Sequence, residues 1–253
     1  MEQNVKVLVI IPAYNESSNI ESVISHLESR ESEYDYLIIN DGSTDSTVDI
    51  CSKKNFHYLN LPINLGIGGA VQAGYIYAQR NGYDIAVQMD GDGQHDIAYL
   101  KDMLQPLLKN ETDIVIGSRF LKKEGYQSSV ARRIGIKFLS FLILITTGKK
   151  IKDVTSGYRA VNSKFIDIYV NDYPTDYPEP EAIVTAIMNR GRITEVPVQM
   201  RAREGGNSSI TFKKSIYYMI KVTLAILVCR LSYGLRRGKP EADKAGIKPG
   251  KGA

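Results

Sequence analysis

Short apolar runs that alternate with helical patterns constrain the fold of the first half of this chain. Residues 5–11 (VKVLVII) are mostly β-branched, which is typical of a parallel strand buried on both faces. Similar runs follow at 36–39, 56–61, 85–87 and 113–117. Helical patterns lie between them, at 18–27, 64–80 and 99–108. This alternation predicts an α/β fold with a doubly wound, mostly parallel sheet flanked by helices.

Polar loops follow the first, second and fourth of these runs. Their sequences are PAYNE at 12–16, NDGSTDST at 40–47 and DGDGQH at 90–95. In doubly wound sheets, ligands bind beyond the carboxyl ends of the strands. We therefore expect these three loops, which are distant in sequence, to converge on one site.

The loop at 90–95 contains two carboxylates two residues apart. In an extended chain alternate side chains point to the same side, so Asp90 and Asp92 can reach one divalent cation. Gln94 supplies a neutral oxygen, and hard oxygen ligands of this kind suit Mg²⁺ or Mn²⁺. Gly91 and Gly93 leave room for a bound phosphate. The alternative is an ordinary Asp-Gly turn after a strand.

The glycine-rich run at 66–69 (GIGG) is a weaker signal. It lacks the spacing of the dinucleotide fingerprint and of the P-loop, and it follows the third strand rather than the first. Close packing of a helix against the sheet is the favoured interpretation. The amides of this run could still lie near a phosphate.

The second half of the chain has a different character. A compact polar turn is predicted at 154–159, a helix after 177–181, a strand at 193–200 and a basic flexible loop at 201–208. Two stretches are strongly apolar, at 134–147 and 216–231, and both are shorter than the roughly 20 apolar residues that a membrane span needs. Each also contains a lysine, which would cost roughly 3 kcal/mol at mid-bilayer. They predict helices that lie on a membrane surface or contact a partner, with core helices as the alternative.

Charge and composition divide the chain into three predicted parts. These are a catalytic domain at 1–212, an apolar amphipathic helix at 213–233 and a disordered basic tail at 234–253. The tail has six Lys/Arg and two acidic residues, against a net charge of +4 for all 253 residues. It could contact anionic lipid or simply aid solubility, and a nucleic-acid partner is not expected. Cys51 and Cys229 have no metal or redox spacing, and a strand begins close to the N-terminus, so a cytoplasmic location is expected.

Seven blocks of sequence together resemble one known family. They are PAYNE at 12–16, NDGSTD at 40–45, NLGIGGA at 64–70, DGDGQ at 90–94, GSR at 117–119, TSGYR at 155–159 and EVPV at 195–198. In this order they resemble the family 2 inverting glycosyltransferases of GT-A fold, over roughly residues 5–210. The branch that they resemble most is that of the dolichyl- and polyprenyl-phosphate sugar synthases.

The resemblance implies a nucleotide-sugar pocket at the first two loops. The residues that it assigns to the nucleotide sugar are Pro12, Tyr14, Glu16, Asp41, Gly68 and Asp90. Asp41 would accept a hydrogen bond from the base, although Asn40 stands where many relatives carry another acid. The alternative for Asp41 is a cap on the helix that follows it.

The resemblance also implies how the diphosphate is held. Asp90, Asp92 and Gln94 would bind a Mg²⁺ or Mn²⁺ ion on the donor. The residues that it assigns to catalysis are Asp92, Arg119, Arg133 and Arg203, the arginines neutralising phosphates of donor or acceptor.

The implied activity is transfer of one sugar, with inversion, from a nucleotide-sugar donor to undecaprenyl or dolichyl phosphate for cell-surface glycan or glycoconjugate synthesis. A lipid phosphate is already ionised, whereas a sugar hydroxyl would need a general base. His95 and Asp153 could serve as that base, but structural roles are favoured for both, and this favours a phosphate acceptor.

Such an enzyme would work as a peripheral protein at the cytoplasmic face of the membrane. It would reach its lipid by a surface helix or through a small membrane-protein subunit, and a homo-oligomer stays open. Two other functions remain as alternatives. One is a family 2 glycosyltransferase that acts on a soluble or growing polysaccharide, and the other is a non-catalytic partner protein that binds nucleotide sugars. A sugar nucleotidyltransferase is disfavoured because the first loop is not glycine-rich.

Overall fold

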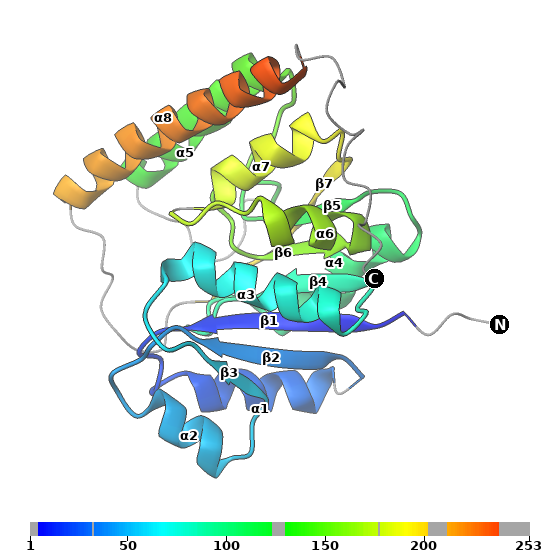
Figure 1. The fold of residues 1–253 in the computed structure, drawn as a ribbon, viewed down its shortest axis with the longest axis vertical. Helices are drawn as coiled ribbons and strands as arrows, with labels where there is room; N and C mark the ends of the chain where they lie inside the picture. The colour runs from blue at the N-terminus through cyan, green and yellow to red at the C-terminus, as the bar shows by residue number, and fades with distance from the viewer. Residues whose placement is uncertain (1–4, 32, 123–129, 177, 202–211, 238–253) are drawn as a thin grey trace, which may run out of the picture.

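The computed structural model describes residues 5–31, 33–122, 130–176, 178–201 and 212–237. A single twisted sheet runs through the molecule, with helices on both of its faces (Figure 1). The predicted α/β class is therefore confirmed.

Seven strands form the sheet within the described residues, in the order β3-β2-β1-β4-β6-β5-β7. Their bounds are β1 Val7–Ala13, β2 Asp35–Asn40, β3 Tyr58–Asn60, β4 Ile85–Gln88, β5 Ile114–Ser118, β6 Arg159–Asn162 and β7 Ile193–Pro197. Every pairing is parallel except those of β6, which runs antiparallel to both β4 and β5. The sequence predicted the six parallel strands and missed β6, which it assigned in part to a polar turn.

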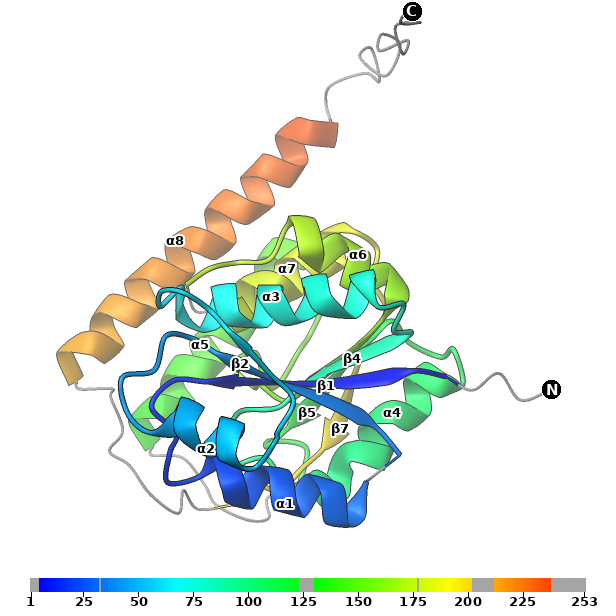
Figure 2. The ribbon, with the colours of Figure 1, turned by 60° about the horizontal axis from the view of Figure 1, so that its bottom comes forward.

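The helices connect these strands. Their bounds are α1 Ile20–Arg30, α2 Thr47–Lys53, α3 Gly66–Arg80, α4 Leu100–Leu108, α5 Val130–Thr147, α6 Ser163–Asn171, α7 Pro178–Met188 and α8 Phe212–Arg237, with a short 3₁₀ helix η1 at Ile97–Tyr99. Figure 2 shows α1, α2 and α4 on one side of the sheet and α3, α6 and α7 on the other.

Strand β1 illustrates why a continuous apolar run was needed at this place. Alternate residues of a strand point to opposite faces. Leu8 and Ile10 lie in the core beneath α3, whereas Val7, Val9 and Ile11 lie in the core beneath α1 and α4. All seven residues of β1 are buried, as expected for a strand covered on both faces.

The order of strands places the carboxyl ends of β1, β2 and β4 side by side. The chain proceeds from β1 to β2 on one side, and returns to place β4 on the other side of β1. These strands are parallel, so the loops that leave their carboxyl ends lie at the same edge of the sheet, where ligands bind in doubly wound folds. The polar loop at 12–16 and the loop at 90–95 are the two that meet there.

The two apolar stretches of the second half form α5 and α8, which lie side by side (Figures 1 and 2). The helices run parallel, since Gly135 approaches Met219 and Arg230 donates to the carbonyl of Thr146 eleven residues further along each helix. The stretch predicted as a helix at 213–233 lies within α8, which continues to Arg237, and the division of the chain into three parts stays a prediction. Residues 238–253 lie outside the described residues. None of the described helices is long and apolar enough to cross a membrane.

Candidate active site

The loops after β1 and β2 are tied together by Asn15. Its backbone has a φ of 57°, a left-handed conformation that asparagine tolerates. The Asn15 N–H donates to Ser43 Oγ at 3.0 Å, and its side-chain Oδ1 accepts from the N–H of Thr44 at 2.8 Å. The two loops that the sequence placed at one site are thus in direct contact.

The three residues predicted to line the nucleotide pocket lie along this junction. Pro12 is buried within β1, and Tyr14 is 48% exposed. Glu16 lies in the turn before helix α1, where its carbonyl accepts from the N–H of Asn19 and Ile20 and its carboxylate accepts from the Asn19 side chain at 2.7 Å. Contact of these residues with a nucleotide stays a prediction.

Asp41 stabilises the start of a helix, but not of the helix that follows it. Its Oδ1 accepts from the N–H of Leu65 at 2.7 Å, at the N-terminus of α3. Burial raises the pKa of Asp41, and the N–H groups of Leu65 and Gly66 oppose that rise. The capping role considered for α2 therefore falls to α3, 24 residues further along the chain. A hydrogen bond from a nucleotide base to Asp41 stays a prediction.

Gly68 is required by packing against a loop rather than against the sheet. A Cβ at this position would lie 2.1 Å from the carbonyl oxygen of Pro174 and 2.3 Å from that of Thr175. The helix–sheet contact that the sequence suggested occurs further along the same helix, where a Cβ on Gly74 would lie 2.3 Å from Ile10 Cγ2. Binding of the donor by Gly68 stays a prediction.

The loop with the two aspartates meets the first loop at Gly91. A Cβ on Gly91 would lie 3.1 Å from the carbonyl oxygen of Pro12, so the backbones of the two loops are adjacent. Asp92 Oδ1 accepts from the N–H of Gln94 at 3.0 Å, and Gly93 has a φ of +75°. The predicted Asp-Gly turn is therefore present. A turn of this kind does not compete with metal binding, because a carboxylate has further lone pairs.

The donor set of this loop fits a hard divalent cation. Asp90 is 37% exposed, and Asp92 and Gln94 are both partly exposed. Among the described residues no cluster of three or more His, Cys, Asp or Glu is suited to a metal. Two carboxylates and an amide, completed by phosphate oxygens of a substrate, are nevertheless the pattern in which proteins commonly hold Mg²⁺.

Arg119 is held by a buried carboxylate. Its Nε donates to Asp153 Oδ2 at 2.7 Å and its Nη2 to Asp153 Oδ1 at 2.6 Å, while Nη2 also reaches Thr155 Oγ1. Burial would lower the pKa of Arg119, but Asp153, and then Glu179 and Asp90, raise it. The Nη1 group makes no hydrogen bond to the described residues, so it is available to donate to an anionic ligand.

The two candidate bases have structural partners. Asp153 is fully buried against Arg119, and its own N–H donates to Glu195 at 2.8 Å. His95 is buried, its ring is stacked on that of Tyr158, and its Nδ1 accepts from the N–H of Asp90 at 3.0 Å. Burial lowers the pKa of His95 to about 4, against attraction from Asp92. Both side chains therefore have the structural roles that the sequence favoured for them.

Of the two remaining predicted arginines, the structure describes only Arg133. Arg133 lies near the start of α5 and makes no hydrogen bond or ion pair with Asp90 or Arg119. Arg203 lies outside the described residues. Arg201, two positions earlier, does contact the aspartate loop, through its N–H to the carbonyl of Gln94 and through an ion pair with Asp96 at 3.0 Å.

Sequence reasoning missed two charged residues near the aspartate loop. Glu179 lies in the first turn of α7; burial raises its pKa, Arg159 opposes the rise, and Asp90 adds to it. Arg159 is 3% exposed, opens β6 and donates to the carbonyl of Ser156. The sequence signal for Glu179 was Pro178, which marks the start of a helix. Arg159 is brought close to the aspartate loop because β6 pairs antiparallel with β4, where Arg159 lies opposite Gln88.

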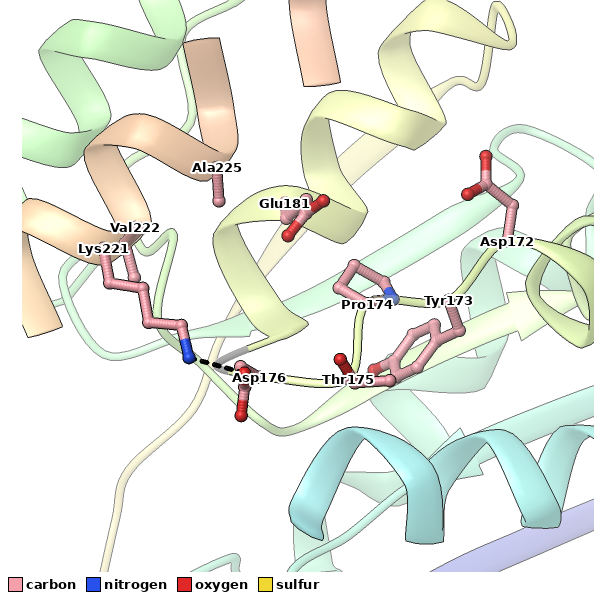
Figure 3. Close-up of a pocket in the computed structure, with 9 residues that line it drawn as sticks. All are labelled: Asp172, Tyr173, Pro174, Thr175, Asp176, Glu181, Lys221, Val222 and Ala225. Carbon is pink, nitrogen blue, oxygen red and sulfur yellow. Dashed lines mark hydrogen bonds and ion pairs between the residues drawn. The ribbon is translucent and has the colours of Figure 1, made fainter. Parts of the chain in front are cut away.

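A separate cavity of about 300 Å³ lies between α8, the start of α7 and residues 172–176 (Figure 3). Three carboxylates line it, Asp172, Asp176 and Glu181, together with Lys221, which pairs with Asp176 at 2.5 Å. None of the predicted site residues lines this cavity.

Comparison with known proteins identifies the family. The sequence pattern described as glycosyl transferase family 2 matches residues 8–169. A UDP-N-acetylglucosamine–dolichyl-phosphate N-acetylglucosaminyltransferase of Methanococcus voltae is 31% identical over 240 residues, covering 85% of this chain and 94% of the relative. An undecaprenyl-phosphate mannosyltransferase of Micrococcus luteus is 31% identical over 216 residues, covering 81% and 88%.

Solved structures confirm the fold. Glucosyl-3-phosphoglycerate synthase from Mycobacterium tuberculosis, in complex with UDP, has a TM-score of 0.71 at 19% identity, covering 94% of this chain and 82% of that chain. A further structure of that synthase holds Mn²⁺, UDP and glucosyl-3-phosphoglycerate, with a TM-score of 0.66 at 18% identity over 90% of this chain and 80% of that chain. With the family pattern across more than half of its length and two relatives above 30% identity, this chain belongs to glycosyl transferase family 2 and is a glycosyltransferase of GT-A fold.

Proposed function

We propose that this enzyme transfers one sugar from a nucleotide-sugar donor to a polyprenyl phosphate, with inversion. The observation that carries the donor half is the contact of the loops after β1 and β4, where Gly91 meets Pro12 beside Asp90 and Asp92. The acceptor half is supported by the two relatives, whose names state dolichyl and undecaprenyl phosphate.

The donor diphosphate is held in this proposal by the aspartate loop and by Arg119. Asp90, Asp92 and Gln94 would bind Mg²⁺ or Mn²⁺, which supplies a Lewis acid against the charge that develops on the leaving diphosphate. The ion pair with Asp153 keeps the Arg119 guanidinium in place, and Nη1 of Arg119 would donate to the diphosphate. Arg133 and Arg203 remain candidates for the acceptor phosphate.

The acceptor site needs no general base if the acceptor is a phosphate. Its oxygen is ionised at neutral pH and can attack the anomeric carbon directly. The two side chains that the sequence offered as bases, His95 and Asp153, are occupied by structural contacts. This supports a phosphate acceptor.

The outer faces of α5 and α8 support a peripheral location at the cytoplasmic face of the membrane. Both helices expose large apolar side chains at helical spacing. They are Ile134, Phe138, Phe141, Leu144 and Ile145 on α5, and Tyr217, Ile220, Leu224, Leu227, Val228 and Leu231 on α8. Neither helix contains an acidic residue, while α5 has three Lys/Arg and α8 has six. An apolar face flanked by cations is typical of helices that lie in an anionic membrane interface.

The transfer assay tests this proposal directly. Purified protein with Mn²⁺ or Mg²⁺ is mixed with radiolabelled nucleotide sugars and undecaprenyl phosphate, and label is measured in the organic phase. Asp92→Asn keeps an acceptor for the Gln94 N–H but loses the charge, so transfer should fall by at least about 100-fold. Asp49→Asn, at an exposed carboxylate on α2, is the matched control and should be active. Full turnover by Asp92→Asn would disprove the metal assignment.

A second candidate function is transfer to a sugar hydroxyl, and Glu179 favours it. Burial raises the pKa of the Glu179 carboxyl, which makes its ionised form a stronger base toward a hydroxyl. Glu179→Gln distinguishes the two functions. With a phosphate acceptor this variant should keep most of its kcat, whereas with a hydroxyl acceptor its turnover should fall by about 100-fold or more.

A further inference from the structure

Only one tautomer of the neutral His95 ring is compatible with the hydrogen bond that the ring accepts. The N–H of Asp90 donates to Nδ1 at 3.0 Å, so Nδ1 carries no proton. In the neutral ring the proton must then be on Nε2. The ring is held in this position because it is buried and stacked on Tyr158, with 4.9 Å between ring centroids and 15° between planes.

The Nε2 atom faces the carboxylate of the same aspartate. Nε2 is buried and has no hydrogen-bond partner among the described residues. Asp90 Oδ2 lies 3.7 Å away, which is longer than a hydrogen bond but within the range of an attraction between an N–H and a carboxylate. His95 therefore contacts both the main chain and the side chain of Asp90.

Gly157 closes another side of the same carboxylate. A Cβ at Gly157 would lie 3.0 Å from Asp90 Oδ2 and 3.1 Å from Oδ1, so a side chain there would crowd the carboxylate. The next residue, Tyr158, forms the stack with His95. One short segment thus limits the movement of both the carboxylate and the imidazole.

We propose that His95 is a positioning residue whose Nε2–H orients the Asp90 carboxylate toward the donor-bound cation, a role that rests on the proposed metal-dependent transfer. It is not a general base, because one ring nitrogen accepts from the backbone and the other carries the proton. A histidine N–H on a ligand carboxylate acts through that ligand, and loss of such a partner commonly weakens metal affinity by about 10- to 100-fold.

Two substitutions separate the two contacts of His95. In His95→Asn the amide oxygen lies near the place of Nδ1, so it can still accept from the Asp90 N–H but does not reach Oδ2. In His95→Gln the amide nitrogen reaches the place of Nε2 and can still donate to Oδ2. The readouts are the Kd of Mn²⁺ in the presence of UDP, measured by calorimetry, and the midpoint of thermal unfolding. His26→Asn, at an exposed histidine of α1, is the matched control.

We expect His95→Asn to weaken Mn²⁺ binding about 10- to 100-fold, and His95→Gln to remain closer to wild type. The proposal is overturned if His95→Asn folds and binds Mn²⁺ as tightly as wild type, or if the two variants lose affinity equally. Asp92→Asn distinguishes this failure from failure of the proposed function. If Asp92→Asn also binds Mn²⁺ normally, the metal site itself is wrong, whereas a loss in Asp92→Asn alone overturns only the role of His95.

A measurement on the wild-type protein applies even if neither variant folds. Imidazole ¹⁵N spectra report which ring nitrogen carries the proton. We expect the Nε2–H form, with a shift of Nε2 when Mg²⁺ and UDP are added. A proton on Nδ1, or an Nε2 signal unchanged by Mg²⁺ and UDP, would overturn the proposal.

Discussion

The guanidinium of Arg119 and the carboxylate of Asp153 form a two-point ion pair, with contacts of 2.7 and 2.6 Å and no exposure of the Asp153 side chain. A third hydrogen bond runs from the Arg119 backbone to the same carboxylate at 3.0 Å. This pair joins the end of β5 to the segment before β6. It therefore couples the stability of the fold to the position of a predicted catalytic arginine.

Removing the charge of Asp153 should destabilise the protein strongly. Asp153→Asn leaves the mostly buried guanidinium of Arg119 without its counterion, which commonly costs about 3–5 kcal/mol. Urea unfolding at neutral pH measures the change. Arg119→Lys retains one charge but loses the two-point geometry, so it should cost less stability than Asp153→Asn. Equal stability of wild type and Asp153→Asn would contradict the importance of this pair.

Acid should weaken the contact between Asp113 and Arg192. Burial would raise the pKa of Asp113, but hydrogen bonds from Arg192 and Asn162 lower it to about 2. A carboxyl with a lowered folded-state pKa stabilises the protein above its unfolded pKa, and that contribution is lost as the pH falls from about 4 toward 2. Because Arg192 is half exposed, we expect Asp113 to contribute only about 1 kcal/mol to the free energy of unfolding at neutral pH.

The measurement for Asp113 is a difference between two proteins. Asp113→Asn lacks the titrating group, so its gap in unfolding free energy from wild type should be largest at neutral pH and shrink at about pH 2. A gap that is the same at both pH values would contradict the lowered pKa.

Gly42 and Gly82 form a matched pair of glycine positions. Both have positive φ values, 68° and 66°, which an alanine adopts only with strain. A Cβ on Gly42 would also lie 2.8 Å from the Asn64 backbone nitrogen, whereas nothing lies within 4 Å at Gly82. Gly82→Ala should therefore cost about 1 kcal/mol and Gly42→Ala clearly more. Thermal unfolding of both variants measures the difference, and equal losses would show that the close approach at Gly42 is unimportant.

The apolar faces of α5 and α8 should bind anionic membranes. Ile145→Asp on α5 replaces a side chain that is 64% exposed, so it should leave the fold stable but reduce flotation with phosphatidylglycerol-containing vesicles severalfold. Leu108→Asp, at a 45% exposed leucine at the end of α4, is the control. Equal flotation of the two variants would argue against this surface as the membrane contact.

Local patterns were sufficient for most of the parallel sheet. A strand covered on both faces must be apolar at every position, so β1 could be read from residues 5–11 alone, and the turn residues after β4 marked the aspartate loop. Strand β6 was missed because its four residues follow a polar turn and carry Arg159 and Asn162 at their ends. It is a strand because β4 and β5 both offer it backbone partners, which no local pattern encodes.

The α/β class, the convergence of the polar loops and the family could be predicted from the residues alone, because they depend on periodicity and on residue types at short spacing. The side-chain contacts of the site, in contrast, depend on how distant segments pack together. Asp41 caps a helix 24 residues away, and Gly157 reaches Asp90 across 67 residues. His95 lies close to Asp90 in sequence, yet its role depends on the stack with Tyr158. Side-chain contacts of this kind are set by the pairing of strands that are distant in the chain, so their physical origin lies in the assembled sheet.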